Sequence, residues 1–248
     1  MNDIILSDGE HIEDLGEGVY LLVSKEHTFG TDALLLNDFA TVKLNDKAID
    51  LGTGCGIIPF LWLRDKKAQK YRGAVEIQQN ACEQFKTSKK LNNDESVNLF
   101  EGDLKEKSLI PQREFFDVVT MNPPYKAENT GIKNGDESAK IARHEITCNI
   151  DDITECSARI LRFGGRLCIC TRPERMLDSC VSMQKHGIEP KRVRFVQKNG
   201  ESAPWLVLID GRKGGAKGVR VEKPLLMQTG DGKPSEEILN ITEKYRKV

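Results

Sequence analysis

The stretch Ala48-Ile-Asp-Leu-Gly-Thr-Gly-Cys-Gly-Ile-Ile-Pro59 decides the fold of this chain. It begins with a short, largely apolar run, which is typical of a buried strand. Glycines follow at positions 52, 54 and 56, and glycine at alternate positions lets the backbone turn sharply beneath a ligand with its amides exposed. The stretch therefore predicts a strand that leads into a ligand-binding loop.

Further short apolar runs follow this strand and alternate with segments of helical pattern. The runs lie at 73–77, 97–100, 116–121 and 165–170, and the helical segments lie at 78–91, 151–161 and 174–186. This alternation predicts a doubly wound α/β fold with a mostly parallel sheet, in which Gly164-Gly165 ends the second helix. The runs 192–197 and 205–210 leave no room for a crossover helix, so they should pair antiparallel as an edge hairpin. The expected sheet has seven strands.

The size and composition of the chain indicate one globular domain. Its 248 residues are 38% hydrophobic and 30% charged, and we expect residues 1–248 to form that domain, with a C-terminal strand and helix in 219–248. No apolar run is long enough for a membrane span, and the first ten residues lack a signal-peptide pattern. The seven scattered cysteines contain no Cys-x-x-Cys pair. These features exclude a spanning or secreted protein and favour the reducing cytoplasm, with neither a disulfide framework nor a metal site.

Charge is distributed unevenly, although 37 basic and 38 acidic residues leave a net charge of −1. Residues 1–50 contain three Lys against eleven Asp and Glu, whereas residues 162–223 contain fourteen Lys and Arg against six acids. An asymmetry of this size indicates that one end of the molecule faces a polyanion. An ordinary solvated surface with no partner is an equally good explanation from charge alone.

Acidic residues mark the ends of three expected strands. Asp50 lies in the first strand, Glu76 closes the second, 24 residues beyond Gly52, and Asp103 follows the third. Ligands of open α/β sheets bind outside the carboxyl ends of the strands, where an acid can accept ribose hydroxyls or an adenine amine. A dinucleotide fingerprint would place its third glycine at position 57, where this chain has Ile57, so a pyrophosphate cofactor is disfavoured.

The Gly-x-Gly-x-Gly loop instead resembles the cofactor loop of class I S-adenosylmethionine-dependent methyltransferases, whose ligand carries a methionine moiety and no phosphate. The resemblance implies a class I methyltransferase sheet and S-adenosylmethionine as the cofactor. It implies that Glu76 accepts hydrogen bonds from both ribose hydroxyls and that Asp103 accepts a hydrogen bond from the adenine amine. The implied cofactor contacts from the loop and the strand ends are Asp50, Gly52, Thr53, Gly54, Gly56, Glu76 and Asp103.

The expected fourth strand ends in Met121-Asn122-Pro123-Pro124-Tyr125. Two consecutive prolines fix the backbone and remove two amide donors, which leaves the Asn122 side-chain oxygen and the Pro123 carbonyl as a rigid pair of acceptors. Two acceptors on the hydrogens of a ring-conjugated amine would localise its lone pair and aim it at a sulfonium methyl group. Tyr125 would stack on the planar group. An ordinary turn is the alternative, and the position at a strand end next to the glycine-loop strand argues against it.

Together the two motifs resemble the amino-group methyltransferases that act on adenine, cytosine or a glutamine amide. This resemblance makes Asn122, Pro123, Pro124 and Tyr125 the candidate catalytic residues, and Asn122 is also a candidate cofactor contact. No metal is implied.

Segment 29–36 resembles the segment that packs over the cofactor in the small tRNA adenine methyltransferases. The similarity continues through 142–146, 161–166, 172–175, 213–215 and 231–232. The chain is therefore similar to the tRNA (adenine, N6-position) methyltransferases that modify the adenine beside the anticodon of a valine tRNA. The resemblance implies tRNA as the partner, residues 1–47 as a cofactor-covering segment, and Thr31 and Asp32 as cofactor contacts.

The candidate RNA contacts are basic residues in the second half of the chain, namely Arg143, Arg172, Arg175, Arg212 and Lys213. Plain surface charge explains Arg172 and Arg175 about as well. Cys168 and Cys170 face one side of a strand and indicate core packing rather than a metal site, and Trp205 also indicates core.

Three alternatives stay open. The same acceptor pair suits the guanine amine of ribosomal RNA or a glutamine side chain. A methyltransferase-like module without chemistry would bind RNA only. The oligomeric state and the exact nucleotide do not follow from the sequence.

Overall fold

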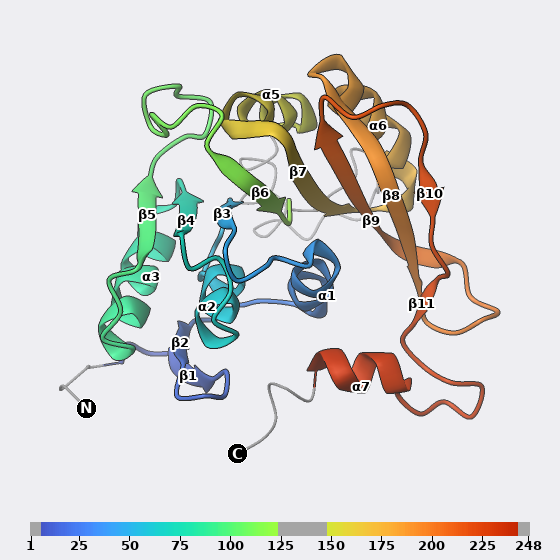
Figure 1. The fold of residues 1–248 in the computed structure, drawn as a ribbon. Helices are drawn as coiled ribbons and strands as arrows, with labels where there is room; N and C mark the ends of the chain where they lie inside the picture. The colour runs from blue at the N-terminus through green and yellow to red at the C-terminus, as the bar shows by residue number, and fades with distance from the viewer. Residues whose placement is uncertain (1–5, 124–147, 243–248) are drawn as a thin grey trace, which may run out of the picture.

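The computed structural model describes residues 6–123 and 148–242, and its centre is a mostly parallel sheet with strand order β10-β8-β9-β7-β6-β3-β4-β5 (Figure 1). β5, β4, β3, β6 and β7 run parallel, β9 runs antiparallel to β7 and β8, and short β10 and β11 pair with β8. The strands are β3 Lys47–Leu51, β4 Tyr71–Glu76, β5 Val97–Glu101, β6 Phe116–Met121, β7 Leu161–Thr171, β8 Ile188–Gln197, β9 Pro204–Lys213, β10 Arg220–Val221 and β11 Leu225–Leu226. The predicted mostly parallel α/β sheet with an antiparallel hairpin is confirmed. Within the described residues the sheet has nine strands rather than the seven predicted, because short β10 and β11 add to its edge beside β8.

Helices cover both faces of the sheet (Figure 1). On one face lie α1 Thr31–Ala40, α2 Ile57–Arg64 and α3 Gln79–Leu91, and on the other α5 Ile150–Ile160 and α6 Met176–Lys185, preceded by the short η1 Pro173–Arg175. Successive strand residues enter opposite cores: on β7, Cys168 and Cys170 face α1 and α2, whereas Leu167 and Ile169 face α5 and α6. The interpretation of the two cysteines as core residues is confirmed.

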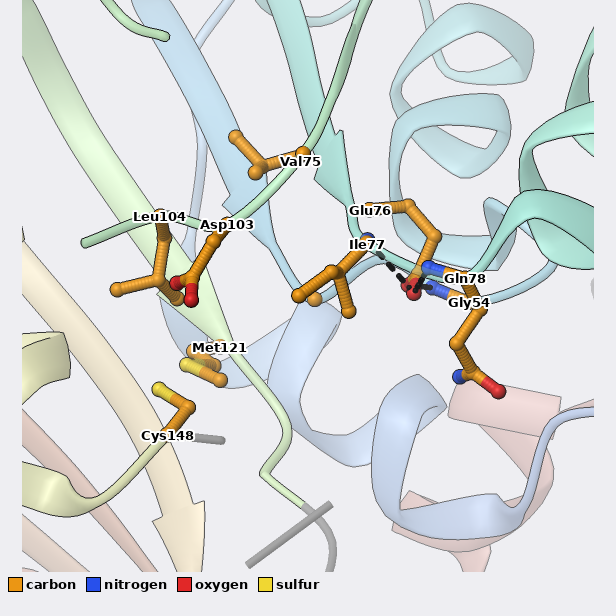
Figure 2. Close-up of a pocket in the computed structure, with 11 residues that line it drawn as sticks. Gly54, Val75, Glu76, Ile77, Gln78, Asp103, Leu104, Met121 and Cys148 are labelled. Carbon is orange, nitrogen blue, oxygen red and sulfur yellow. Dashed lines mark hydrogen bonds between the residues drawn. The ribbon is translucent and has the colours of Figure 1, made fainter. Parts of the chain in front are cut away.

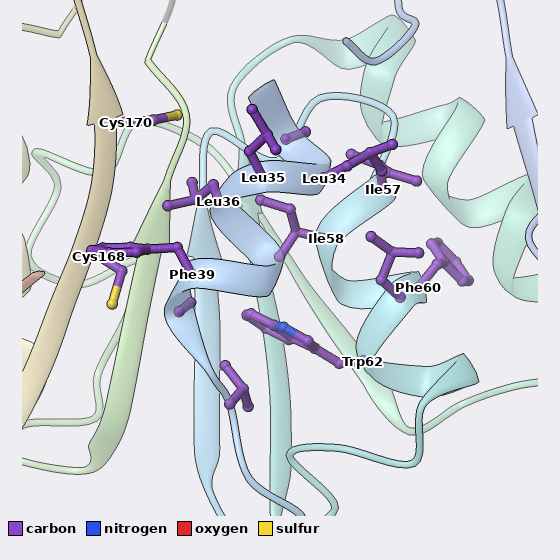
Figure 3. Packing of buried hydrophobic residues seen from close by; sticks show 14 of the residues in the cluster. Leu34, Leu35, Leu36, Phe39, Ile57, Ile58, Phe60, Trp62, Cys168 and Cys170 are labelled. Atoms are coloured by element: carbon purple, nitrogen blue, oxygen red, sulfur yellow. The ribbon is translucent and has the colours of Figure 1, made fainter. Parts of the chain in front are cut away.

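Helix α1 packs between β7 and α2 (Figure 3). Leu35 and Leu36 of α1 belong to the same buried cluster as Trp62 of α2 and Cys168 of β7. The last helix, α7 Glu236–Thr242, adds Ile238 and Ile241 to this cluster. The apolar face of α1 thereby fixes the position of the segment that precedes β3.

Two arginines, from β7 and β8 on either side of β9, hold the last turn of α1. Arg166 donates to the Ala40 carbonyl at 2.8 Å and Arg192 donates to the Phe39 carbonyl at 2.5 Å. Both guanidinium groups also contact buried Asp210, at 2.9 and 3.2 Å. The free carbonyls of a helix C-terminus attract cations, so this arrangement fixes α1 against β7, β8 and β9.

A small hairpin, β1 His11–Asp14 and β2 Tyr20–Val23, packs on α3. Polar side chains one turn apart on α3 satisfy the open edge of β2. Asn92 accepts from the Tyr20 amide and donates to its carbonyl, Ser88 accepts from the Leu22 amide, and Gln84 donates to the Leu22 carbonyl. The hairpin therefore extends the α3 side of the molecule, a role that the sequence prediction for residues 1–47 did not include.

Segments 161–165 and 174–186 differ from the sequence prediction. Gly164 and Gly165 do not end a helix: α5 ends at Ile160, and Leu161 continues directly into β7 in an extended conformation. Gly165 is required by packing, because a Cβ there would lie 2.9 Å from the Phe116 carbonyl oxygen. The helix predicted over 174–186 divides into η1 and α6.

Candidate active site

A cavity of about 180 Å³ lies where the loops after β3, β4, β5 and β6 meet. These four strands are parallel, so their carboxyl ends share one edge of the sheet. Figure 2 shows this cavity, whose lining residues are Gly52, Gly54, Val75, Glu76, Ile77, Gln78, Gly102, Asp103, Leu104, Met121 and Cys148. Ligands of open parallel sheets bind at this edge, and the predicted glycine loop and two of the three predicted acids contribute to the wall.

The glycine loop crosses from β3 to α2 in conformations that other residues rarely adopt. Gly52 and Gly54 have φ angles of 61° and 58°, in the left-handed region. The Thr53 amide donates to the Val75 carbonyl at 2.9 Å and fastens the loop to the end of β4. A Cβ on Gly52 would lie 3.3 Å from the Met121 methyl group, whereas a Cβ on Gly54 would enter open space. The open space in front of Gly54 has room for a ligand, and a side chain at position 54 would occupy that space.

Glu76 connects the glycine loop to the loop after β4. Its Oε2 accepts from the Gly54 amide at 2.8 Å, and its Oε1 accepts from the Ile77 and Gln78 amides, each at 2.9 Å (Figure 2). A carboxylate has about four acceptor positions, and these backbone amides occupy three of them. The buried Glu76 side chain thus organises the cavity wall as well as facing it.

Asp103 also faces the cavity, at the end of β5. Its Oδ1 accepts from the Lys105 amide at 2.9 Å, and the Lys105 ammonium lies 3.3 Å from Oδ2. The carboxylate is therefore held in place within the wall, on the side opposite Glu76 in Figure 2.

Asp50 has a different place from the other two acids, because it is buried inside the sheet and does not line the cavity. The Thr120 hydroxyl of β6 donates to its Oδ1 at 2.6 Å, as the register between the two strands requires. Burial raises the pKa of Asp50 to about 7, because the Thr120 hydrogen bond offsets desolvation only in part. Asp50 joins β3 to β6 beneath the loop.

Asn122 and Pro123 follow β6 directly, at the same edge of the sheet, and both are partly buried. Met121, the residue before them, lines the cavity. The Asn122 Oδ1 accepts from the Cys170 thiol of β7 at 3.1 Å. The candidate catalytic residues Pro124 and Tyr125 and the candidate RNA contact Arg143 lie outside the described residues.

Thr31 and Asp32 form the first turn of α1 and do not line the cavity. The Asp32 Oδ1 accepts from the Ala33 amide at 3.0 Å, which places the acid at the positive end of the helix dipole. Thr53 and Gly56 likewise support the loop without lining the cavity, and a Cβ on Gly56 would lie 2.5 Å from the Phe85 ring.

The structure separates the candidate RNA contacts into two groups. Arg172 and Arg175 follow the carboxyl end of β7, on the same edge as Asn122. The Arg172 guanidinium donates to the Trp205 carbonyl at 2.9 Å and lies 5.9 Å from the centre of its ring. Trp205 is accordingly only partly buried, at the rim of the core.

Arg212 and Lys213 lie at the other end of the sheet. Arg212 pairs with Arg166 near the amino ends of the parallel strands. The Lys213 ammonium donates to the Leu161 carbonyl at 2.8 Å and contacts Glu114 at 3.0 Å. These two residues are not brought together with the cavity.

Ion pairs neutralise much of the positive charge that the sequence concentrates in 162–223. The pairs are Arg162–Asp117, Arg166–Asp210, Arg175–Asp178, Lys185–Asp151, Arg192–Asp210, Arg194–Glu237, Lys213–Glu114 and Arg220–Glu222. Several of the acids belong to other parts of the chain. The charge asymmetry is therefore smaller in space than along the sequence.

Sequence reasoning missed Thr120, Ile77, Gln78 and Cys148. Thr120 stands two residues before Asn122, a position whose importance comes from pairing with Asp50. Ile77 and Gln78 follow Glu76 and supply the amides that hold it. Nothing in the sequence marks Cys148, which comes to the wall through the start of α5. Burial raises the pKa of its thiol to about 12, so it stays protonated at neutral pH.

Within residues 6–123 and 148–242, no cluster of side chains could hold a metal ion. Over the same residues, no helix is long and apolar enough to cross a membrane.

Comparison with known families defines the class of protein. The methyltransferase small domain model matches residues 18–186, more than half of the chain, and this protein belongs to that family. The methyltransferase class expected from the sequence is confirmed, and with it S-adenosylmethionine as the cofactor.

Named relatives within this class are tRNA-modifying enzymes. The tRNA1(Val) (adenine(37)-N6)-methyltransferase of Aeromonas salmonicida is 26% identical over 188 residues, which cover 74% of this chain and 76% of that protein. The protein of the same name from Tolumonas auensis is 23% identical and covers 87% of this chain and 88% of its own length.

Solved structures share the fold. A predicted O-methyltransferase of Agrobacterium tumefaciens, Atu636, has a TM-score of 0.68 at 17% identity, covering 86% of this chain and 96% of that one. The M. jannaschii TYW2 structure, a complex with AdoMet, has a TM-score of 0.55 at 14% identity, with coverage of 84% and 88%.

Proposed function

We propose that this protein transfers a methyl group from S-adenosylmethionine to the exocyclic N6 amine of an adenine in tRNA, with adenine 37 of a valine tRNA as the expected target. The observation that carries this proposal is the position of Asn122 and Pro123. They follow β6 at the edge where the cavity lies, next to the cavity residue Met121. The names of the relatives support the choice of tRNA and of adenine.

In this proposal the cavity holds the cofactor. S-adenosylmethionine, when bound, supplies a methyl group on a positively charged sulfur. The open space before Gly54 fits it, Glu76 offers its remaining acceptor position to the ribose, and Asp103 offers an oxygen to the adenine amine. Thr31, Asp32, Asp50, Thr53 and Gly56 act by supporting these groups, or by contacts that the family resemblance implies.

Asn122 and Pro123 prepare the target amine. The Asn122 Oδ1 and the Pro123 carbonyl each accept one amine hydrogen, which pulls the nitrogen toward a tetrahedral geometry and localises its lone pair. The nitrogen then gains the methyl carbon as the bond from that carbon to the sulfur breaks, which leaves S-adenosylhomocysteine. The nitrogen, now positively charged, releases one proton to solvent. A base of matched pKa is not required before attack. Pro124 would stiffen this turn and Tyr125 would stack on the base.

The RNA would approach the carboxyl edge of the sheet. Arg172 and Arg175 stand there, and their guanidinium groups suit phosphate contacts. Arg143 is a further proposed contact from the sequence. Arg212 and Lys213 would contact a part of the tRNA remote from the reacting base. An enzyme with this substrate works where tRNA is, which is the cytoplasm.

Mass spectrometry of nucleosides tests the proposal. Valine tRNA is incubated with the protein and S-adenosylmethionine carrying a deuterated methyl group, and a transcript with guanine in place of adenine 37 serves as control. We expect labelled N6-methyladenosine from the first RNA alone. Labelled N2-methylguanosine from ribosomal RNA, labelled glutamine in protein, or no transfer to any of these would each overturn it.

A further inference from the structure

The thiol of Cys170 contacts the proposed catalytic side chain. β6 and β7 pair in parallel with Met121 opposite Ile169, so Asn122 and Cys170 are the next positions on the two strands. The Cys170 thiol donates to the Asn122 Oδ1 at 3.1 Å. Figure 3 shows the sulfur directed from β7 toward the end of β6. Cys170 is 0% exposed and Asn122 is partly buried, so the thiol reaches the asparagine from the core side.

The orientation of an asparagine amide matters for the proposed chemistry. Its oxygen accepts hydrogen bonds and its NH₂ group donates them, and half a turn about the last side-chain bond exchanges the two. If the NH₂ group faced the target amine, two donors would meet and the amine would not be activated. A hydrogen-bond donor beside the amide favours the oxygen on its own side, and it therefore selects the productive orientation.

Cys170 has the properties that such a selection requires. A thiol is a weak donor and behaves otherwise as a small apolar group, so it can be buried in a core without many polar partners. Cys170 belongs to the cluster formed by α1, α2 and the sheet. An amide oxygen has two lone pairs, so a hydrogen bond from the thiol does not by itself exclude one from the target amine.

We infer that Cys170 is a positioning residue, which holds the Asn122 amide with its oxygen available to the target amine. This inference rests on the proposed function of Asn122. Cys170 does not touch the substrate in this scheme and acts only through Asn122. Because a thiol donor is weak, the expected effect is about tenfold in kcat, equivalent to about 1.4 kcal/mol.

Cys168 provides a matched control. It lies two residues earlier on β7, faces the same core and is also 0% exposed. Cys168→Ala and Cys170→Ala each remove one buried sulfur atom from the same layer. Cys168→Ala also removes an acceptor that lies 3.9 Å from the Arg166 guanidinium, whereas only Cys170→Ala removes the donor to Asn122. Cys170→Ser restores a hydroxyl donor of similar size.

The experiment measures kcat and KM for tRNA, the Kd of S-adenosylhomocysteine, and Tm for these variants. We expect Cys170→Ala to lower kcat about tenfold relative to Cys168→Ala, with KM, Kd and Tm matching that control. Cys170→Ser should recover to within about threefold of wild type, since a hydroxyl donor replaces the thiol. In the Asn122→Ala background, Cys170→Ala should add nothing.

A binding measurement gives a second readout that does not depend on turnover. Wild type should bind an anticodon stem-loop with adenine at the target position more tightly than one with purine, which lacks the amine. Cys170→Ala should reduce this difference and Cys168→Ala should not.

Two outcomes would overturn the inference, namely equal kcat in the two alanine variants, or a serine variant as slow as Cys170→Ala. Failure of the proposed role of Asn122 looks different, because Asn122→Ala would then methylate tRNA at the wild-type rate whatever Cys170 does. Failure of the proposed substrate would leave wild type itself without activity on tRNA.

Discussion

The two ends of the parallel sheet handle charge in opposite ways. At the carboxyl end, the Glu76 carboxylate is held by three backbone amides. At the amino end, the Asp117 carboxylate is held by the Lys47 amide and by the guanidinium of Arg162, and the Lys213 ammonium by Glu114 and a carbonyl. The charges of Asp117 and Lys213 at the amino end are paired with opposite charges on other side chains. At the carboxyl end, the charge of Glu76 is held by backbone donors beside a cavity.

The direction of the chain explains this difference. α2 and α3 both begin at the carboxyl end, and in the described structure neither first turn has a side-chain cap. Uncapped first turns leave amide donors and a positive dipole end, which attract an acid such as Glu76 or a polar ligand. The candidate site therefore lies at the carboxyl end of the sheet, although basic residues are common at both ends.

The largest expected effect concerns how stability depends on pH through two carboxyl groups, buried Asp50 and partly buried Asp117. The Asp50 pKa is raised to about 7, so its ionisation opposes folding, and stability should fall by up to about 4 kcal/mol as pH rises from about 4 to 7. The variant Asp50→Asn should lose this dependence, as chemical denaturation at several pH values will show.

Asp117 supplies the contrast at the amino end. Burial alone would raise its pKa, but the Lys47 amide and the Arg162 guanidinium lower it overall. Its contribution to stability should therefore be present above its ordinary pKa and disappear as the solution becomes more acidic. If Asp117→Asn and Asp50→Asn changed the pH profile in the same direction, the contrast between the two ends would fail.

Loss of the proposed acceptor should have the next largest effect. Asn122→Ala should lower kcat by a hundredfold or more, about 3 kcal/mol, because one positioned electrostatic group is removed from the transition state. The Kd of S-adenosylhomocysteine should change little, since Glu76 and Asp103 remain. Steady-state kinetics and calorimetry check both statements, and wild-type turnover would remove Asn122 from the mechanism.

Glu76→Ala should instead weaken binding of the cofactor, by about 2 kcal/mol, because amides of both loops lose a charged acceptor. Glu76→Gln keeps one oxygen acceptor and should weaken it less. Calorimetry with S-adenosylhomocysteine orders the two variants. An unchanged Kd in the alanine variant would show that the carboxylate serves the fold alone.

The smallest expected effect compares one exposed arginine at each end. Arg175→Glu at the carboxyl end should lower tRNA affinity about tenfold. It should also reduce the slope of log affinity against log salt concentration by the amount expected for about one phosphate contact. Arg212→Glu at the amino end should lower affinity less, by about twofold, because it would contact only a part of the tRNA remote from the reacting base. Equal losses would instead show that tRNA binds both ends equally strongly, as the charge distribution along the sequence suggests.

The fold was predictable where local patterns decide it. The runs that became β3, β4, β5, β6 and β7 are apolar and short, and the close spacing of β8 and β9 permits only an antiparallel pair. Gly164 and Gly165 misled the prediction, because a helix stop and a tight strand contact with Phe116 both require glycine. The packing of the β1–β2 hairpin on α3 depends on side chains some seventy residues away in the sequence, which no local pattern reveals.

The sequence by itself determined the class of this protein, because glycine spacing and strand-end acids are local features whose chemistry depends on residue type. The amine target that the Asn-Pro-Pro-Tyr motif indicates stays a prediction. Only the tertiary structure decided which acids face the cavity, since Asp50, Glu76 and Asp103 look alike along the chain. Burial and strand register place Asp50 beside Thr120 within the sheet, whereas Glu76 and Asp103 line the cavity. Strand direction likewise decided that Arg212 lies far from Asn122, because neighbours in an antiparallel pair end at opposite edges.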